Sequence, residues 1–155
     1  MNGNRLSPDD PIEWLSRAKS SFSLARQQSQ DIYLEDLCFQ AQQAAQKAIK
    51  AVHITKGLVF PYVHDISQLL SALEKNGMTV PIELRATSKL TIYDALTRYL
   101  GLGTPVSKEE YDEGMQMAEA VVSWAETYVR KYTNMGRLRS IRLLWTKGPV
   151  IHNKQ

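Results

Sequence analysis

The segment from residue 34 to residue 52 constrains the fold more than any other part of the sequence. Its apolar side chains recur every three or four residues, which is the spacing of one face of an α-helix. They are Leu34, Leu37, Cys38, Ala41, Ala44, Ala45, Ala48, Ile49 and Val52. Four of these nine are alanines, whose small side chains let a second helix approach closely, and Gly57 is a natural stop. The sequence therefore predicts a helix that ends before Gly57 and packs tightly against another helix.

Helical periodicity also appears in four further segments. They are expected at residues 11–26, 66–75, 81–100 and 108–132. Asp10, Asp65 and Ser107 stand where an N-cap belongs, and Pro11 is suited to the first helical position. No segment shows the strict alternation of a strand. Because the connections are short, the sequence predicts an all-α fold, an up-down antiparallel bundle of four to five helices.

Charge divides the chain unevenly. Residues 127–155 carry seven basic residues and no acid, whereas residues 1–126 carry 12 basic and 16 acidic residues, a net of −4. We expect one domain, residues 1–133, followed by a basic amphipathic C-terminal extension, residues 134–155, that holds one short helical turn. Such an extension suits phosphates or an acidic partner, or it folds back on the acidic body.

Several classes of protein are not indicated by the sequence. No run approaches the roughly 18 uncharged apolar residues of a membrane span, and the polar first ten residues predict no secretory signal. A single cysteine, Cys38, provides no disulfide framework, and the three histidines stand at no metal-binding spacing. We therefore expect a cytoplasmic protein without a metal or cofactor, and spacing alone identifies no catalytic residues.

Topology suggests one candidate site. If successive helices alternate in direction, the end of the second, the start of the third and the end of the fourth meet at one end of the bundle. A cation there suits a nucleotide, an RNA phosphate or a protein partner. The candidate binding residues are Arg98, Tyr99, Lys47, Lys50, His64 and Asp65.

Each candidate also has a structural interpretation. Arg98 is equally well explained by an ion pair with Asp94, four residues earlier. Asp65 is the expected cap of the third helix, with His64 leading into it, and this interpretation outweighs a catalytic one. The two lysines are typical of side chains whose stems pack while the ammonium stays in water.

The run from Cys38 to Ala51, CFQAQQAAQKAIKA, resembles the signature of HEPN domains (higher eukaryotes and prokaryotes nucleotide-binding). Further matches occur in the family's order over residues 11–132: Trp14-Leu15 with Ala18, His64-Asp65-Ile66, Arg98-Tyr99 and Trp124. The resemblance implies a bundle of four to five helices, a homodimer, and action beside a small nucleotidyltransferase, often as a toxin–antitoxin pair.

HEPN members of such pairs are often metal-independent ribonucleases whose motif is an Arg, four to six residues, then a His. None of the three histidines here has an arginine at that distance before it, and Gln46 replaces the Glu common in the family run. We therefore expect a binding module rather than an enzyme. The alternatives are a ribonuclease that uses Arg98 with His64, or a purely structural partner domain.

Overall fold

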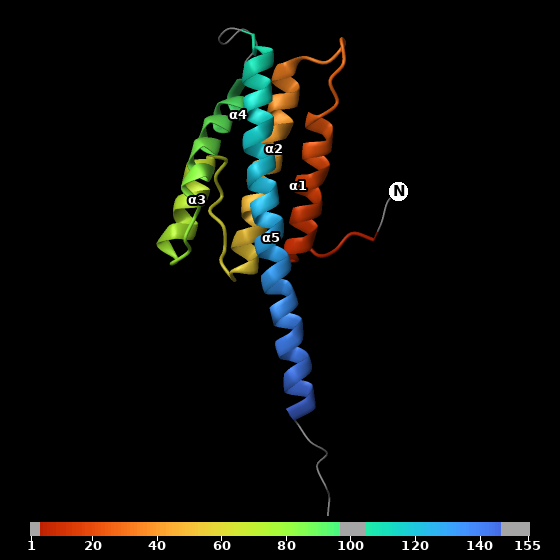
Figure 1. The fold of residues 1–155 in the computed structure, drawn as a ribbon, viewed down its shortest axis with the longest axis vertical. Helices are drawn as coiled ribbons and strands as arrows, with labels where there is room; N and C mark the ends of the chain where they lie inside the picture. Colours follow the sequence, from red (N-terminus) through yellow and green to blue (C-terminus); the bar gives the residue numbers. More distant parts are fainter. Residues whose placement is uncertain (1–3, 97–104, 147–155) are drawn as a thin grey trace, which may run out of the picture.

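The computed structural model describes the backbone of residues 4–96 and 105–146, and the side chains of residues 4–94 and 105–136. Within these ranges the regular structure is helical throughout, without a strand, which confirms the predicted all-α bundle (Figure 1). Its elements are α1 (Pro11–Ala25), α2 (Leu34–Thr55), α3 (Ile66–Lys75), the 3-10 helix η1 (Ile82–Thr91), α4 (Ile92–Leu96) and α5 (Lys108–Thr146).

Helix α2 lies at the centre and packs against α1 on one side and α5 on another. The predicted alanine face is fully buried at Ala41, Ala44, Ala45 and Ala48. Because alanine has no atoms beyond Cβ, the neighbouring helices approach α2 closely along this face. Ile49 continues the face as one of the largest fully buried side chains, and its burial stabilises the fold by about 1.5–3 kcal/mol.

The predicted helix starts are confirmed by their hydrogen bonds. The backbone N–H of Ile12 donates to Asp10 Oδ1 at 2.9 Å, and that of Ser67 donates to Asp65 Oδ1 at 2.8 Å. At the start of α5, Glu110 N donates to Ser107 Oγ at 3.1 Å and Ser107 N donates to Glu110 Oε2 at 3.2 Å. This reciprocal pair is a capping box, and it satisfies two donors that the helix leaves free.

The fourth predicted helix differs from the expectation. Residues 82–91 form the 3-10 helix η1, and the α-helical part, α4, begins only at Ile92. The buried residues of η1 are Leu84, Thr87 and Leu90, which are three apart. Because a 3-10 helix has 3.0 residues per turn, these three side chains lie in one row. An α-helix starting at Pro81 would place Ser88, four residues after Leu84, on the inner face instead, and that side chain is only half-buried.

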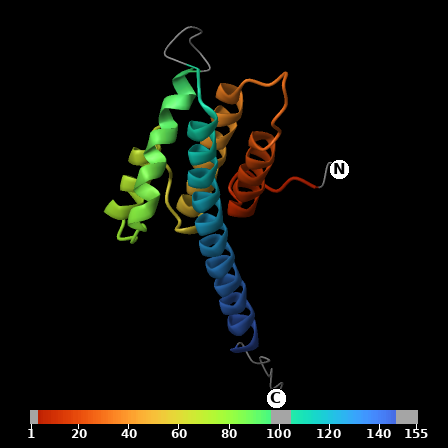
Figure 2. The ribbon, with the colours of Figure 1, turned by 45° about the horizontal axis from the view of Figure 1, so that its top comes forward.

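Helix α3 does not run in the direction that strict alternation requires. After α2 ends, residues 58–65 turn back along α2, so α3 runs in the same direction as α2 (Figures 1 and 2). Leu58 N donates to His53 O near the end of α2, whereas the carbonyl of His64 accepts from Gln42, three turns earlier. The end of α2, the start of α3 and the end of α4 therefore lie at different heights and do not meet at one end.

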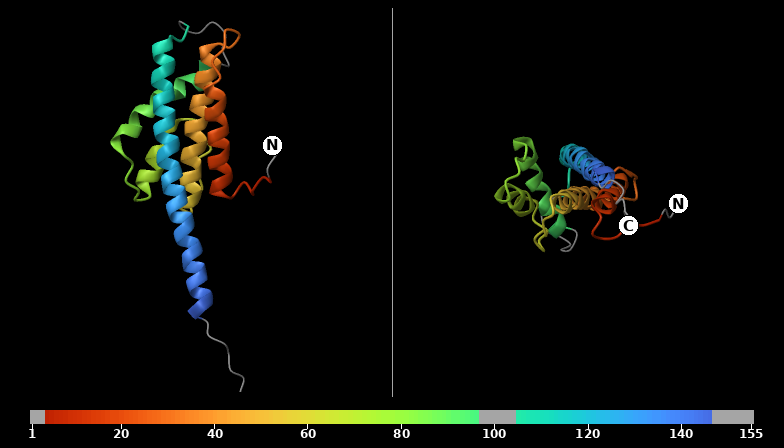
Figure 3. Two further views of the ribbon diagram at one scale, coloured as in Figure 1. Left: turned by 45° about the vertical axis from the view of Figure 1, so that its right-hand side comes forward. Right: turned by 90° about the horizontal axis from the view of Figure 1, so that it is seen from below.

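Helix α5 continues well past the residue at which the sequence suggested it would end. It is continuous from Lys108 to Thr146, and its last turns extend beyond the other helices (Figure 3). With 39 residues it is about 58 Å long. Glu109 and Glu110 lie in its first turn and interact favourably with the positive end of the helix dipole, whereas the basic residues of its second half lie before its last turn. The basic extension therefore begins as a continuation of α5.

Candidate functional site

Two buried glutamines on α2 hold the returning segment 58–65. Gln42 and Gln46 are 0% and 2% exposed, and being four residues apart they lie on one face of the helix. Gln46 Nε2 donates to the carbonyl of Val63 at 3.2 Å and lies 2.9 Å from His64 Nδ1. Gln42 Nε2 donates to the carbonyl of His64 at 3.3 Å. Neither glutamine was among the residues predicted for the site.

These bonds determine which nitrogen of the neutral His64 ring carries the proton. The amide nitrogen of Gln46 is a donor only, so His64 Nδ1 accepts and the proton of the neutral ring is on Nε2. This assignment follows from the hydrogen-bond network. The His64 side chain is exposed, so its Nε2–H is available to an incoming oxygen.

Asp65, the next residue, is the N-cap of α3, as its structural interpretation predicted. Its Oδ1 accepts from the backbone N–H groups of Ser67 at 2.8 Å and Gln68 at 3.4 Å. The N–H of Ile66 donates to Thr91 Oγ1 at 3.2 Å, which ties the start of α3 to the end of η1. The contacts of Asp65 thus fix the position of α3 and, with it, the position of His64.

Lys47 and Lys50 lie on the side of α2 that faces α1. Lys47 Nζ donates to Ser21 Oγ at 2.8 Å. Lys50 Nζ lies 5.6 Å from the ring centre of Trp14 and 5.1 Å from that of Phe60, within cation–π range of both. Among the residues that the structure describes, neither ammonium forms an ion pair with a carboxylate.

The environment of both lysines disfavours their charged form. Burial lowers the pKa of Lys47, and the nearby Arg17 guanidinium lowers it further. Burial also lowers the pKa of Lys50, with Lys47 as the second cause. We call the surface formed by Trp14, Arg17, Lys47, Lys50 and Phe60 the basic–aromatic surface. An anion placed there would relieve the repulsion between its cations, and its rings offer stacking to a base.

Arg98 and Tyr99 lie outside the described residues, so the predicted Arg98–Asp94 pair and the predicted ligand contact are both untested. The described part of α4 leads toward the end of the bundle at which α2 begins. There Tyr93 hydrogen-bonds to Cys38, whose pKa is raised to about 12, chiefly by burial. Lys47, Lys50, His64 and Asp65 lie further along α2 or beside it. The predicted meeting of the end of α2, the start of α3 and the end of α4 at one bundle end is wrong, because α3 starts partway back along α2.

His53 is a buried histidine that the sequence did not single out as functional. Its Nδ1 lies 3.0 Å from the carbonyl of Ile49 and donates to it, and its ring meets the Phe60 ring edge-on. Nε2 is buried without a hydrogen-bond partner. Burial lowers the pKa of His53, which keeps the ring neutral. These contacts make His53 part of the packing beneath the basic–aromatic surface.

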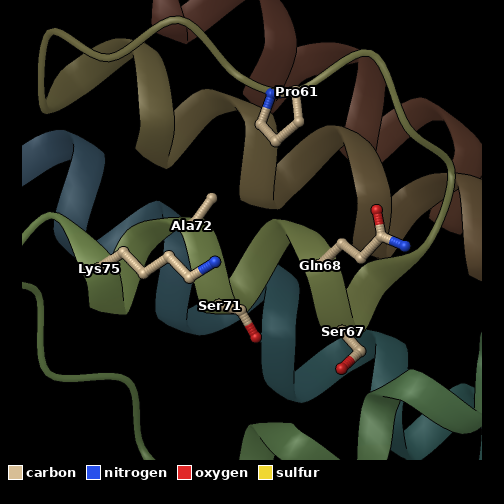
Figure 4. A pocket seen from close by; sticks show the side chains of 6 residues that line it. All are labelled: Pro61, Ser67, Gln68, Ser71, Ala72 and Lys75. Atoms are coloured by element: carbon tan, nitrogen blue, oxygen red, sulfur yellow. The ribbon is translucent and has the colours of Figure 1, made fainter.

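A shallow depression lies between the segment 58–65 and α3 (Figure 4). It is lined by Pro61, Ser67, Gln68, Ser71, Ala72 and Lys75. Lys75 is its one charged lining residue. Within the described part of the chain, no group of three or more His, Cys, Asp or Glu side chains is placed to hold a metal ion. No helix in that part has the length and apolarity needed to cross a bilayer.

Comparisons with known proteins agree with this architecture. The family model of the HEPN domain matches residues 12–128, and the chain therefore belongs to the HEPN domain family. It is similar in structure to an archaeal HEPN homologue, ST0689, with a TM-score of 0.63 and 24% identity over 77% of this chain and 98% of the other. It is also similar to TT1696 from Thermus thermophilus, with a TM-score of 0.63 and 27% identity over 76% of this chain and 97% of that chain. A comparison with curated proteins found no match.

Proposed function

We propose that this HEPN domain is a binding module that acts with a nucleotidyltransferase-type protein, as part of a toxin–antitoxin pair in the cytoplasm. Its ligand would be a nucleotide or an RNA phosphate. The observation that carries the proposal is the basic–aromatic surface, in which Lys47 and Lys50 lack a carboxylate partner among the described residues and stand beside two aromatic rings.

The chemistry of this surface suits a nucleotide. Half-buried ammonium groups bind phosphate oxygens more strongly than fully solvated ones do, because less water screens the charge. Trp14 and Phe60 meet edge to face with ring centres 5.4 Å apart, and a base can stack where the lysine now lies. Lys50 lies one helical turn from Gln46, so His64 is placed to add a donor at the edge of the same surface.

Titration of the folded protein with ATP and with a short single-stranded RNA tests this proposal. We expect Lys47→Gln with Lys50→Gln to weaken binding at least about tenfold and to reduce its salt dependence, since two phosphate contacts are lost. Lys75→Gln is the matched control, because Lys75 lies on α3 and is not one of the residues that form the basic–aromatic surface. Unchanged affinity in the double variant, with its helical circular dichroism intact, would contradict the proposal. The Arg98→Ala variant tests the remaining candidate in the same assay.

The second candidate function is metal-independent RNA cleavage. It is favoured by one observation: the exposed His64 has its Nδ1 2.9 Å from the amide nitrogen of Gln46, which leaves the proton of the neutral ring on Nε2. In this role His64 would exchange a proton with a ribose or leaving-group oxygen while Arg98 stabilises the phosphate charge. Cleavage should then persist in EDTA and disappear in His64→Ala. Absence of cleavage by the folded wild-type protein would exclude this alternative and leave the binding module.

A further inference from the structure

The side-chain nitrogen of Lys47 is held by a neutral partner. Two other lysines of the chain, Lys19 and Lys108, are ion-paired with carboxylates at 2.6 Å, and such a partner stabilises the ammonium form. Lys47 Nζ donates instead to Ser21 Oγ at 2.8 Å. A hydroxyl oxygen accepts from a free amine as well as from an ammonium, so this contact holds Lys47 in place in both states.

The surroundings of Lys47 favour the free amine, which is the nucleophilic form of lysine. Burial lowers its pKa, and the Arg17 guanidinium lowers it further. Desolvation and a neighbouring cation both activate a lysine as a nucleophile. Lys47 is half-buried rather than enclosed, so a small reagent can reach it. The pKa of Lys50 is also lowered, but its ammonium lies against the rings of Trp14 and Phe60, which stabilise the charge.

Two further cations stand together on one side of Lys47. Helices α1 and α2 run in opposite directions (Figure 1), so the turn before Ser21 on α1 lies beside the turn after Lys47 on α2. The first of these turns carries Arg17 and the second carries Lys50. Arg17 Nε donates to Glu13 Oε1 at 3.1 Å, and the Arg17 side chain is 52% exposed. Its guanidinium is therefore oriented and still open to solvent, and with Lys50 it is suited to bind a phosphate.

We propose that Lys47 is an acylation site, at which an acyl phosphate docks its phosphate group on Arg17 and Lys50 and transfers its acyl group to Lys47 Nζ. The free amine attacks the acyl carbonyl carbon and forms the C–N bond of an amide. The bond from that carbon to the bridging oxygen breaks, and its electron pair leaves with the phosphate. The proton that the amine loses goes to the departing phosphate, which leaves as hydrogenphosphate. The step needs no oxidant or reductant.

Acylation would change the charge of the basic–aromatic surface. An amide carries no charge, so the surface would lose one of its three cations, and the repulsion between Lys47 and Arg17 would end. If the surface binds a nucleotide as proposed above, acylation would weaken that binding and a bound nucleotide would shield Lys47. This consequence rests on the proposed function, whereas the acylation itself does not.

Tandem mass spectrometry of the folded chain after incubation with acetyl phosphate tests the proposal. We expect Lys47 to be acetylated at least about tenfold faster than Lys75, because Lys47 is activated and has a docked reagent beside it. Lys75 is the internal control, since it is exposed on α3 and forms no ion pair among the described residues. The preference should vanish in urea, because it depends on the folded surroundings. Equal rates for the two lysines in the folded protein would overturn the proposal.

The substitution Arg17→Gln tests the docking of the phosphate. It should slow acetylation of Lys47 at least about threefold and leave Lys75 unchanged, because it removes a phosphate contact and a cation that favours the free amine. Arg26→Gln is the matched control, since it removes the same charge after the last residue of α1, where Arg26 lies 4.5 Å from the ring centre of Phe22. Equal rates of Lys47 acetylation in the two variants would overturn the role of Arg17.

Protection by ATP separates the acylation site from the proposed function. If both proposals hold, saturating ATP should slow acetylation of Lys47 and leave that of Lys75 unchanged. Rapid acetylation of Lys47 that ATP does not slow would contradict the nucleotide site and support the acylation site. ATP binding to a chain whose Lys47 is acetylated no faster than Lys75 would overturn the acylation site alone.

Discussion

Gln46 should hold the segment 58–65 against α2, and the substitution Gln46→Met tests this. Methionine has nearly the same length and volume as glutamine but has no amide. The change therefore removes the bonds to the Val63 carbonyl at 3.2 Å and to His64 Nδ1 at 2.9 Å without opening a cavity. We expect the segment to open more often and the His64 ring to lose its fixed tautomer.

The size of the effect follows from what the partners can do instead. A net hydrogen bond between uncharged groups contributes about 0.5–1.5 kcal/mol, so two bonds give at most about 3 kcal/mol. His64 is exposed and Val63 is half-buried, so water can reach both acceptors in the variant. The free energy of unfolding should therefore fall by about 1–2 kcal/mol. Gln40→Met is the control, because Gln40 is half-buried on the same helix.

Urea unfolding measures the change in free energy, and amide hydrogen exchange locates it. Faster exchange confined to residues 58–65, together with a change in the ¹⁵N shifts of the His64 ring, is the expected result. If Gln46→Met and Gln40→Met have equal unfolding free energies and residues 58–65 exchange as in the wild type, then the hydrogen bonds of Gln46 do not hold the segment.

Three further results are expected. Burial lowers the pKa of His53 in the folded state, so its contribution to stability should be full above the unfolded pKa of about 6.5 and should be lost as the pH falls below that value. A profile of the urea midpoint against pH should show this loss, and His53→Leu should flatten it. The Cys38 thiol, with its pKa raised to about 12 by burial, should not react with a disulfide reagent at pH 8 until urea unfolds the chain; rapid labelling of the native protein would contradict this. Gly114→Ala should stabilise α5 by roughly 0.5 kcal/mol if the helical gain of about 1 kcal/mol outweighs the displacement of the buried Leu90, whose Cδ2 would lie 3.3 Å from the new Cβ. A lower melting temperature would show that Leu90 cannot move aside.

The parts of the fold that the sequence predicted are those governed by local interactions. A capping carboxylate or hydroxyl and the first turn of its helix are adjacent in the chain, so the starts at Asp10, Asp65 and Ser107 were readable. The spacing of apolar residues that predicted α2 also involves only residues that are close together in the chain. The direction of α3 could not be predicted in this way, because it depends on hydrogen bonds from Gln42 and Gln46 to carbonyls about 20 residues away.

The same difference between local and distant contacts explains which residues of the candidate site could be predicted. Lys47 and Lys50 were identified from their place in α2, and the structure shows that both are half-buried. Their aromatic neighbours belong to other segments: Trp14 lies in α1, and Phe60 lies in the connection between α2 and α3. Only when residues 58–65 turn back along α2 does Phe60 reach Lys50. A pattern of residue types in one helix contains no information on this contact.

The returning segment therefore links the fold to the site. If residues 58–65 crossed directly to an antiparallel α3, Phe60 would leave Lys50 and His64 would leave Gln46, and α2 would present two solvated lysines and two buried amides without partners. Burying unpaired amides is costly, so the glutamines favour the returning path over the direct one. The path that satisfies them is also the one that places an aromatic ring and a histidine beside the lysines. The interactions that stabilise this part of the HEPN bundle are thus the same ones that assemble its candidate binding surface.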